Sequence, residues 1–410
     1  MPELGKSQES ASFLELDDLL WDDEVMVAET SPERAEGADR DLLAQGHATL
    51  QRLLGRNWEV SIRPERLSSG DGGGDTLLEI KSSDGVYVQM LTEIFRRMTP
   101  KDAEAAAGKA ALVRRVSQYT RLLLIAPWIS PMTQEVLRQH DIDYLDLTGN
   151  ISLSVTRPAI IIHTQGADRA PAGHHSTTKK PQLTGPRAGR LIRLLADVAP
   201  PYRATELAHY AQLSLPYVSR LLDTLDDLLL IRREKKLVVS VNWPQMLRAR
   251  AAAQPDLLRA TRATGMLAPQ GVNAVLEQLK GFEYLGRPGV LVTGSHAART
   301  VAPLSVGGQL MLYIPQAPEN ASDIGDELGL LPVDEGADVL LLHAPDLSVW
   351  QRALWLDGRW QTGFSQLVLD CLTGPGRMPA EGEHLIEFMT THEDRWRKLS
   401  LSEAVDQQLF

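Results

Sequence analysis

The chain has 410 residues, of which 43% are hydrophobic, and a formal net charge of -11 at pH 7. This is enough for roughly two to four domains with proper cores. No apolar run approaches the ~20 residues of a membrane span, and no secretory leader is evident, so we expect a cytoplasmic protein without a membrane partner. The single cysteine, Cys371, excludes internal disulfides and cysteine-rich zinc sites, and we expect it to be a buried core residue.

Residues 1–40 contain 12 acidic and 3 basic residues, which predicts an acidic, mostly disordered tail. A short apolar stretch from Phe13 to Trp21 interrupts the acidic residues. We expect the tail to act mainly as a solubilising segment. The alternative is that this stretch docks on its own protein or on a protein partner.

Residues 41–164 are predicted to form one α/β domain, with a glycine-rich loop at 68–75. Periodicity and turn residues predict helices at 41–55, 101–119 and 131–140, and strands at 58–67, 76–81, 86–95, 122–128, 142–147 and 151–155. The turn Ser83-Asp84-Gly85 is typical of a hairpin. This order of elements resembles the PD-(D/E)xK restriction-nuclease core.

Nucleases of that type need an Asp and a Glu to hold Mg²⁺, and a Lys two residues after the Glu. Glu79 and Lys81 have this spacing, but Lys81 runs into the turn and no helix follows. Glu93 precedes the helix, but Phe95 occupies the place of the lysine. We therefore predict an inactive domain with no catalytic residue, metal or cofactor. The alternative is a Mg²⁺-dependent nuclease that uses Glu79 or Glu93 with Asp75 or Asp84.

The end of this domain carries a distinctive motif, whose matching residues are Ile142, Tyr144, Leu145, Asp146, Gly149 and Asn150. It resembles a motif of AbiEi-type transcriptional regulators, the antitoxin side of type IV toxin–antitoxin systems, although Asp141 stands where that family usually has Gly. The resemblance implies an α/β domain joined to a winged helix. From the residues alone, we expect Asp146 to cap the 148–150 turn and Asn150 to be left-handed there. A polar site formed by these two residues is the alternative.

Residues 165–186 lack apolar periodicity and are predicted to be a linker, so the adjacent His174 and His175 are read as polar filler rather than metal ligands. Residues 187–250 have the pattern of a winged helix-turn-helix, the module that places one helix in the major groove of DNA. Thr205 is expected to be the N-cap of the second helix and Ser214 that of the third. A hairpin with a basic tip follows.

The polar and basic side chains of this module are the predicted contacts with double-stranded DNA. They are Arg187, Arg190, Ser214, Tyr217, Ser219, Arg220, Thr224, Arg232, Arg233, Lys235 and Lys236. Between residues 187 and 250 there are 11 Lys/Arg and 6 Asp/Glu, a net charge of +5, so the remainder of the chain sums to -16. A basic island in an acidic protein is typical of a DNA-binding surface. A protein-interaction module is the alternative.

After a predicted helix at 243–263, residues 264–410 are expected to form a second α/β unit. The strand ending at Thr293, the Gly294-Ser295 turn and the following helix resemble the opening of the nucleotidyltransferase fold, in which Gly-Ser holds a triphosphate. The next strand, 311–314, lacks the two metal-binding Asp residues, so we predict a degenerate domain. Residues 293–298, 338–346 and 364–377 also resemble the C-terminal part of AbiEi-type regulators.

Together these patterns predict an α/β multidomain protein: a nuclease-like domain, a central winged helix-turn-helix, and a degenerate nucleotidyltransferase-like domain. Its predicted function is that of a bacterial, non-catalytic, sequence-specific transcriptional regulator. We expect a homodimer, because one winged helix reads only a few base pairs. The alternatives are the nuclease described above and an antitoxin that binds a toxin protein.

Overall fold

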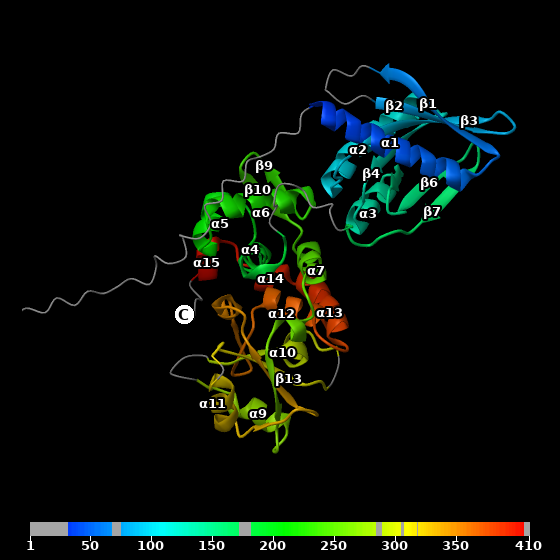
Figure 1. Cartoon of the computed structure of the whole chain (residues 1–410). Coiled ribbons are helices and arrows are strands. Elements are labelled where there is room, and N and C mark those ends of the chain that lie inside the picture. The colour runs from blue at the N-terminus through cyan, green and yellow to red at the C-terminus, as the bar shows by residue number, and fades with distance from the viewer. Residues whose placement is uncertain are drawn as a thin grey trace, which may run out of the picture.

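The structure is a computed structural model that describes residues 32–67, 75–171, 182–283, 289–304, 307–317 and 319–405. Three units follow one another along the molecule in chain order, as Figure 1 shows: an N-terminal α/β unit, a winged helix in the middle, and a C-terminal α/β unit. Within the described ranges, no helix has the length and apolar character needed to cross a membrane.

The N-terminal unit is a seven-stranded sheet in which the strands lie in the order of the sequence, from β1 to β7. β3 pairs in parallel with β4 and β4 with β5, and the other neighbours are antiparallel. The helices are α1 (Pro32–Leu54), α2 (Pro100–Val116) and α3 (Pro131–Gln139), and the strands are β1 (Trp58–Leu67), β2 (Asp75–Ser82), β3 (Tyr87–Ile94), β4 (Thr120–Ala126), β5 (Asp143–Asp146), β6 (Ile151–Val155) and β7 (Ile160–Thr164).

Helices cover both faces of this sheet, which explains why β4 is almost entirely apolar. Leu43 and Leu50 of α1 pack on one face with Leu123, and Ala103 of α2 packs on the other with Leu124. The start of α2 is set by a capping box, in which Thr99 accepts from the Asp102 backbone N–H at 3.2 Å and donates its own to the Asp102 carboxylate at 2.8 Å.

Three expectations for this part of the chain need correction. Residues 32–40 belong to α1 rather than to a disordered tail, because their Ala and Glu residues favour helix; residues 1–31, with the stretch from Phe13 to Trp21, lie outside the described part. Strand β7 was not predicted. The first linker residues are held by the N-terminal unit, since Asn150 Oδ1 accepts from the Gly166 N–H at 2.8 Å and Trp128 Nε1 donates to the Ala167 carbonyl at 2.9 Å. The histidine pair at 174–175 lies outside the described residues.

The middle unit has three helices followed by a hairpin. Its elements are α4 (Gly185–Asp197), β8 (Tyr202–Arg203), α5 (Ala204–Ala211), α6 (Leu215–Asp227), β9 (Ile231–Glu234) and β10 (Leu237–Val241). The three strands form a small sheet in the order β8-β10-β9. Val218, Leu221, Leu222 and Leu225 form the buried stripe of α6, at the spacing of one helical face.

The C-terminal unit contains a second seven-stranded sheet, in the order β14-β11-β15-β13-β12-β17-β16. The helices of this part are α7 (Trp243–Ala253), α8 (Leu257–Ala260), α9 (Val272–Gln278), α10 (Gly294–Val301), α11 (Glu319–Glu327), α12 (Phe364–Leu372), α13 (Met378–Thr391), α14 (Glu393–Trp396) and α15 (Leu401–Val405). The strands are β11 (Ala263–Leu267), β12 (Leu291–Thr293), β13 (Leu310–Ile314), β14 (Leu331–Pro332), β15 (Val339–His343), β16 (Leu354–Leu356) and β17 (Arg359–Gln361).

The single helix predicted over 243–263 is wrong. α7 stops at Ala253 because Pro255 forces Gln254 into an extended conformation (φ -93°, ψ 156°). The short helix α8 follows, and the chain then enters β11, an unpredicted strand. Cys371, as expected, is buried.

The winged helix and the C-terminal unit share one continuous apolar core, which runs from Ala188 to Ala404. A polar junction crosses it: Asp197, at the end of α4, accepts from Arg352 Nε and, at 2.9 Å, from Ser365 Oγ. The N-terminal unit makes a smaller contact, in which Lys101 Nζ lies 2.5 Å from the Asp226 carboxylate of α6 and Met132 packs at the edge of the shared core.

Candidate nucleic-acid interface

The turn between α5 and α6 has the geometry of a helix-turn-helix. Gln212 adopts the left-handed conformation (φ 52°), and Ser214 is the N-cap of α6, as predicted. Thr205 is not the N-cap of α5. The N-cap is Arg203, two residues earlier, and the helix begins at Ala204, because the Glu206 carboxylate accepts a hydrogen bond from the Arg203 backbone N–H at 2.6 Å.

The N-terminal half of α6 is the open part of the helix. Ser214, Ser219 and Arg220 are exposed, and Arg220 Nε donates to the Pro216 carbonyl of its own helix at 3.3 Å. The expectation that Thr224 lies on this outer face is wrong. Its side chain is buried and donates to the Arg220 carbonyl at 3.1 Å, because position 224 follows Leu221 by three residues and lies beside the apolar stripe.

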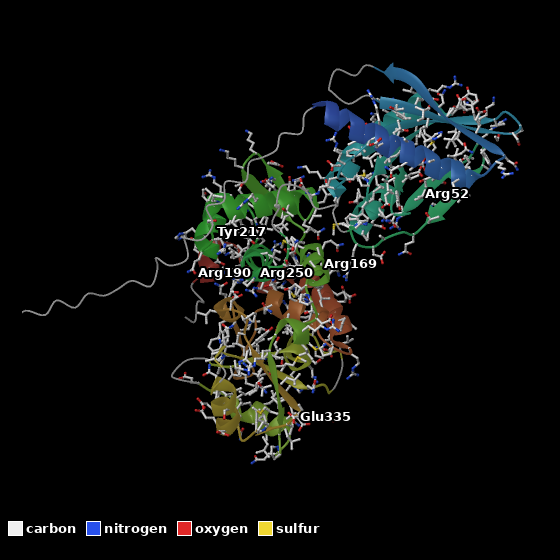
Figure 2. All side chains as sticks on the ribbon, in the orientation of Figure 1. Arg52, Arg169, Arg190, Tyr217, Arg250 and Glu335 are labelled. Atoms are coloured by element: carbon white, nitrogen blue, oxygen red, sulfur yellow. The ribbon has the colours of Figure 1, made fainter. Side chains whose placement is uncertain are left out.

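Tyr217 of α6 is half-buried, and Figure 2 labels it together with Arg190 of α4 and Arg250 of α7. Burial raises the pKa of Tyr217, while the charges of Arg187, Arg250 and Arg220 oppose this rise. Arg187 is exposed at the start of α4, whereas Arg190 is half-buried and donates to the Ala211 carbonyl at 3.4 Å. The start of α4 and the N-terminal half of α6 therefore form one positively charged region.

Arg250 holds the start of α4 in place from the buried side of this region, and it was not among the predicted site residues. Only 6% of it is exposed, and it donates to the backbone carbonyls of Leu183 and, at 3.2 Å, Gly185, just before and at the start of α4. Burial lowers its pKa to about 10. Arg250 follows Met246 by four residues and Leu247 by three, which places all three on one buried face of α7. This spacing could have identified Arg250 from the sequence.

The wing presents three of its four cations to solvent. Lys235, in the left-handed conformation (φ 57°), and Lys236 form the hairpin tip, and the side chain of Arg232 is 72% exposed. Arg232 also lies 3.5 Å from the exposed Glu234, whereas Arg233 is half-buried: its guanidinium donates to the Asp223 carboxylate at 2.6 Å and lies 3.8 Å from that of Asp226. The charge of Arg233 is therefore paired with the carboxylates of Asp223 and Asp226 in α6.

The acidic residues considered for a nuclease site are held apart. Glu79 lies opposite Gln89 in the β2–β3 register, four residues from Glu93, a separation of about 13 Å along the strand. Glu79 pairs with Arg63 at 2.9 Å, and Glu93 pairs with Lys109 of α2. The side chain of Asp75 lies outside the described part. Among the described side chains, no three His, Cys, Asp or Glu gather as metal ligands.

Asp146 is buried beneath the 148–150 turn and accepts five hydrogen bonds there. Its Oδ1 accepts from the backbone and hydroxyl of Thr148 and from the Asn150 backbone, and its Oδ2 accepts from Asn150 Nδ2 and the Ile129 backbone, all at 2.8–2.9 Å. The expected cap is confirmed. Asn150 is not left-handed, because Gly149 takes that conformation (φ 102°).

Gly294 and Ser295, considered for a triphosphate, are the first two residues of α10, and the hydroxyl groups at this helix start donate to carboxylates. Ser295 Oγ donates to Glu381 at 2.5 Å, and Thr293 Oγ1 donates to the buried Asp370 at 2.6 Å. Burial raises the pKa of Asp370 to about 6.

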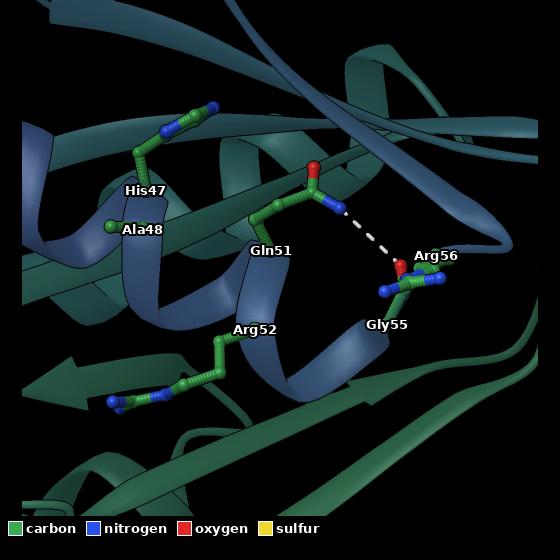
Figure 3. Close-up of a pocket in the computed structure, with 6 residues that line it drawn as sticks. All are labelled: His47, Ala48, Gln51, Arg52, Gly55 and Arg56. Atoms are coloured by element: carbon green, nitrogen blue, oxygen red, sulfur yellow. Dashed lines mark hydrogen bonds between the residues drawn. The ribbon is translucent and has the colours of Figure 1, made fainter.

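A hollow on the surface of α1 was not foreseen from the sequence, and Figure 3 shows its lining. Its residues are His47, Ala48, Gln51, Arg52, Gly55 and Arg56. His47 Nε2 lies 2.8 Å from the Val60 carbonyl, and Gln51 Nε2 donates to the Trp58 carbonyl at 2.8 Å. These polar groups connect the end of α1 to β1, so they position the sheet edge.

Comparison with known proteins identifies the middle unit. Residues 186–235, from the first turn of α4 to the tip of the wing, match the family model of the IclR helix-turn-helix domain. None of the curated proteins matches the chain. A solved structure described as "Structure of EndoMS in apo form" is 16% identical with a TM-score of 0.19, too low to equate the folds, and the match covers 29% of this chain and 46% of that one. The chain thus contains an IclR-type helix-turn-helix DNA-binding domain, which supports a transcriptional regulator.

Proposed function

We propose that the protein is a sequence-specific transcriptional regulator that grips double-stranded DNA with α6 and the wing. One observation carries this proposal: within the matched helix-turn-helix, Arg187, Arg220, Arg232 and Lys235 are all exposed, in a chain whose net charge is -11. Cations kept on an otherwise acidic surface suit phosphate contacts, and an arginine in the open half of α6 suits contact with base edges.

The direct test is to incubate the purified protein with fragmented genomic DNA of its host, with and without Mg²⁺, and to sequence what it retains. We expect discrete enriched sites with a common motif and intact ends. Retention without sequence preference would contradict a regulator. Cut ends that depend on Mg²⁺ would instead establish the nuclease, and would make Glu79 and Glu93 the first residues to replace.

Replacing Arg220 by alanine should weaken binding to the enriched site about 10- to 100-fold, and binding to unrelated DNA much less. The reason is that one good contact between a side chain and a base edge discriminates by about 1–3 kcal/mol. Fluorescence anisotropy with both DNAs measures this. Thr224→Val, one turn further along α6 but buried, is the matched control and should bind as the unmodified protein does. Equal losses on both DNAs would remove Arg220 from base recognition.

Replacing Arg232, Lys235 and Lys236 together by glutamine should reduce the slope of log K against log salt by about 2–3. Each cation that contacts a phosphate contributes about 0.9 to this slope. Affinities measured between 50 and 200 mM salt give the slope. Arg233→Gln is the control, since its charge already pairs with Asp223, and should change the slope by much less. An unchanged slope in the triple variant would exclude the wing from the interface.

The finer features of the proposal rest on local patterns. We propose a homodimer, because two half-sites give usable specificity. We also propose that the N-terminal unit is an inactive relative of the PD-(D/E)xK core, supported by the order α1–β1–β2–β3–α2–β4 and by the ion pairs that hold Glu79 and Glu93. The succession β12, Gly294-Ser295, α10 supports a degenerate nucleotidyltransferase-like unit, and the 142–150 motif supports an AbiEi-type regulator.

A further inference from the structure

Two parts of the chain carry opposite charge: residues 1–31 and the winged helix. Residues 1–31 contain nine acidic residues and one lysine, a net charge of -8. Six of the nine fall within ten residues and alternate with apolar side chains; they are Glu15, Asp17, Asp18, Asp22, Asp23 and Glu24. The winged helix carries the exposed cations of the DNA-binding face, which we define as Arg187, Arg220, Arg232, Lys235 and Lys236.

We propose that the acidic segment 1–31 occupies this DNA-binding face of its own chain and competes with DNA for it. The inference rests on the proposed function and adds a regulatory device to it. The carboxylates of this segment satisfy the same exposed guanidinium and ammonium groups that phosphates would, so binding of the segment and binding of DNA exclude each other.

The contacts between the units bring the attachment point of the segment close to this face. Asp39 of α1 pairs with Arg96 at 3.0 Å, a few residues before α2, and Lys101 in the first turn of α2 reaches Asp226 of α6. Asp226 in turn lies 3.8 Å from Arg233 of the wing. In Figure 1 the first turns of α1 accordingly lie at the end of the N-terminal unit that is nearer the winged helix.

The length of the segment is sufficient for this reach. The helical turns between Pro32 and Asp39 span about 10 Å. A 31-residue coil, the state predicted from the composition, has a root-mean-square span of about 30 Å and a maximum near 100 Å. Tethering at this range gives an effective concentration on the order of millimolar. A segment that binds the face with a dissociation constant of ~0.1 mM then weakens DNA binding about tenfold.

The test compares three versions of the full protein on the same DNA: the unmodified chain, a variant lacking residues 1–31, and a full-length variant with the six clustered acids changed to Asn or Gln. The second and third should bind about tenfold more tightly at 50 mM salt, and this gain should vanish toward 500 mM, because screening weakens the contact between the segment and the face. Equal affinity of all three would overturn the proposal. Tighter DNA binding by the variant lacking residues 1–31, without tighter binding by the variant with the six acids neutralised, would also overturn the proposal.

A measurement without DNA separates this proposal from the proposed function. A labelled peptide of residues 1–31 is titrated into the variant lacking them, and anisotropy should report binding that the Arg232, Lys235 and Lys236 to glutamine changes abolish. Persistent binding to that triple variant would place the segment elsewhere and overturn the inference. If none of the three proteins binds DNA while the peptide binds the winged helix, the proposed function is wrong, but the contact between the segment and the winged helix is confirmed. Inhibition that grows with protein concentration would assign the segment to a second copy and overturn the intramolecular device.

Discussion

Replacing Asp197 by asparagine is expected to lower the free energy of unfolding of the winged helix and C-terminal unit by about 3–5 kcal/mol, the usual cost of removing one partner of a buried ion pair. The side chains of Asp197 and Arg352 are only 8% and 10% exposed. Arg193, also buried, already has its pKa lowered to about 10 by burial and by the charge of Arg352. Without the Asp197 carboxylate, the buried guanidinium of Arg352 would lose its ion-pair partner while remaining close to the positive charge of Arg193.

Urea denaturation followed by tryptophan fluorescence gives this free energy, and Asp223→Asn is the matched control. Asp223 lies in the same unit and pairs with Arg233, but its side chain is 48% exposed, so we expect a loss of no more than about 1 kcal/mol. Because one apolar core spans both parts, the Asp197 variant should lose them in a single transition. A separate early transition of the winged helix alone would show that the shared core does not couple them.

Replacing Asp146 by alanine should destabilise the N-terminal unit by about 3–5 kcal/mol. Five donors would lose their acceptor in a site where only 1% of Asp146 is exposed. Hydrogen bonds to a charged group are worth about 1.5–3 kcal/mol each, but the total loss is smaller than their sum because the turn relaxes in part around the alanine. Hydrogen exchange of the β4, β5 and β6 amides measures the loss in this unit by itself.

Glu135→Ala on α3 is the control for this second prediction, since its pair with Arg138 is exposed and should contribute less than about 1 kcal/mol. A loss at Asp146 no larger than at Glu135 would contradict a structural role. It would return the residue to the alternative of a polar binding site, where removal of a functional carboxylate commonly stabilises a protein.

Local patterns were sufficient for much of the fold. The strand over residues 58–67 was predicted at its observed bounds, and Ser214 was identified as the cap of α6, because the alternation of apolar residues and the chemistry of the cap are local properties. Elements without such patterns were missed. β7, for example, begins with three consecutive isoleucines instead of an alternation and lies at the sheet edge, and β11 was hidden by the helix expected before it.

The features of the candidate site also fall into those that the sequence predicted and those that it did not. The type and order of residues determined that a helix-turn-helix with a basic wing lies between positions 187 and 250, and that Asp146 caps its turn, since these features depend on neighbours in the chain. Only the tertiary structure decided that Thr224 is buried, that Arg233 is neutralised by Asp223, that Arg250 supports the start of α4, and that Asp197 joins α4 to the C-terminal unit. Burial and ion pairing depend on which distant segments pack together, and periodicity reports only which face of an element is covered, not by what.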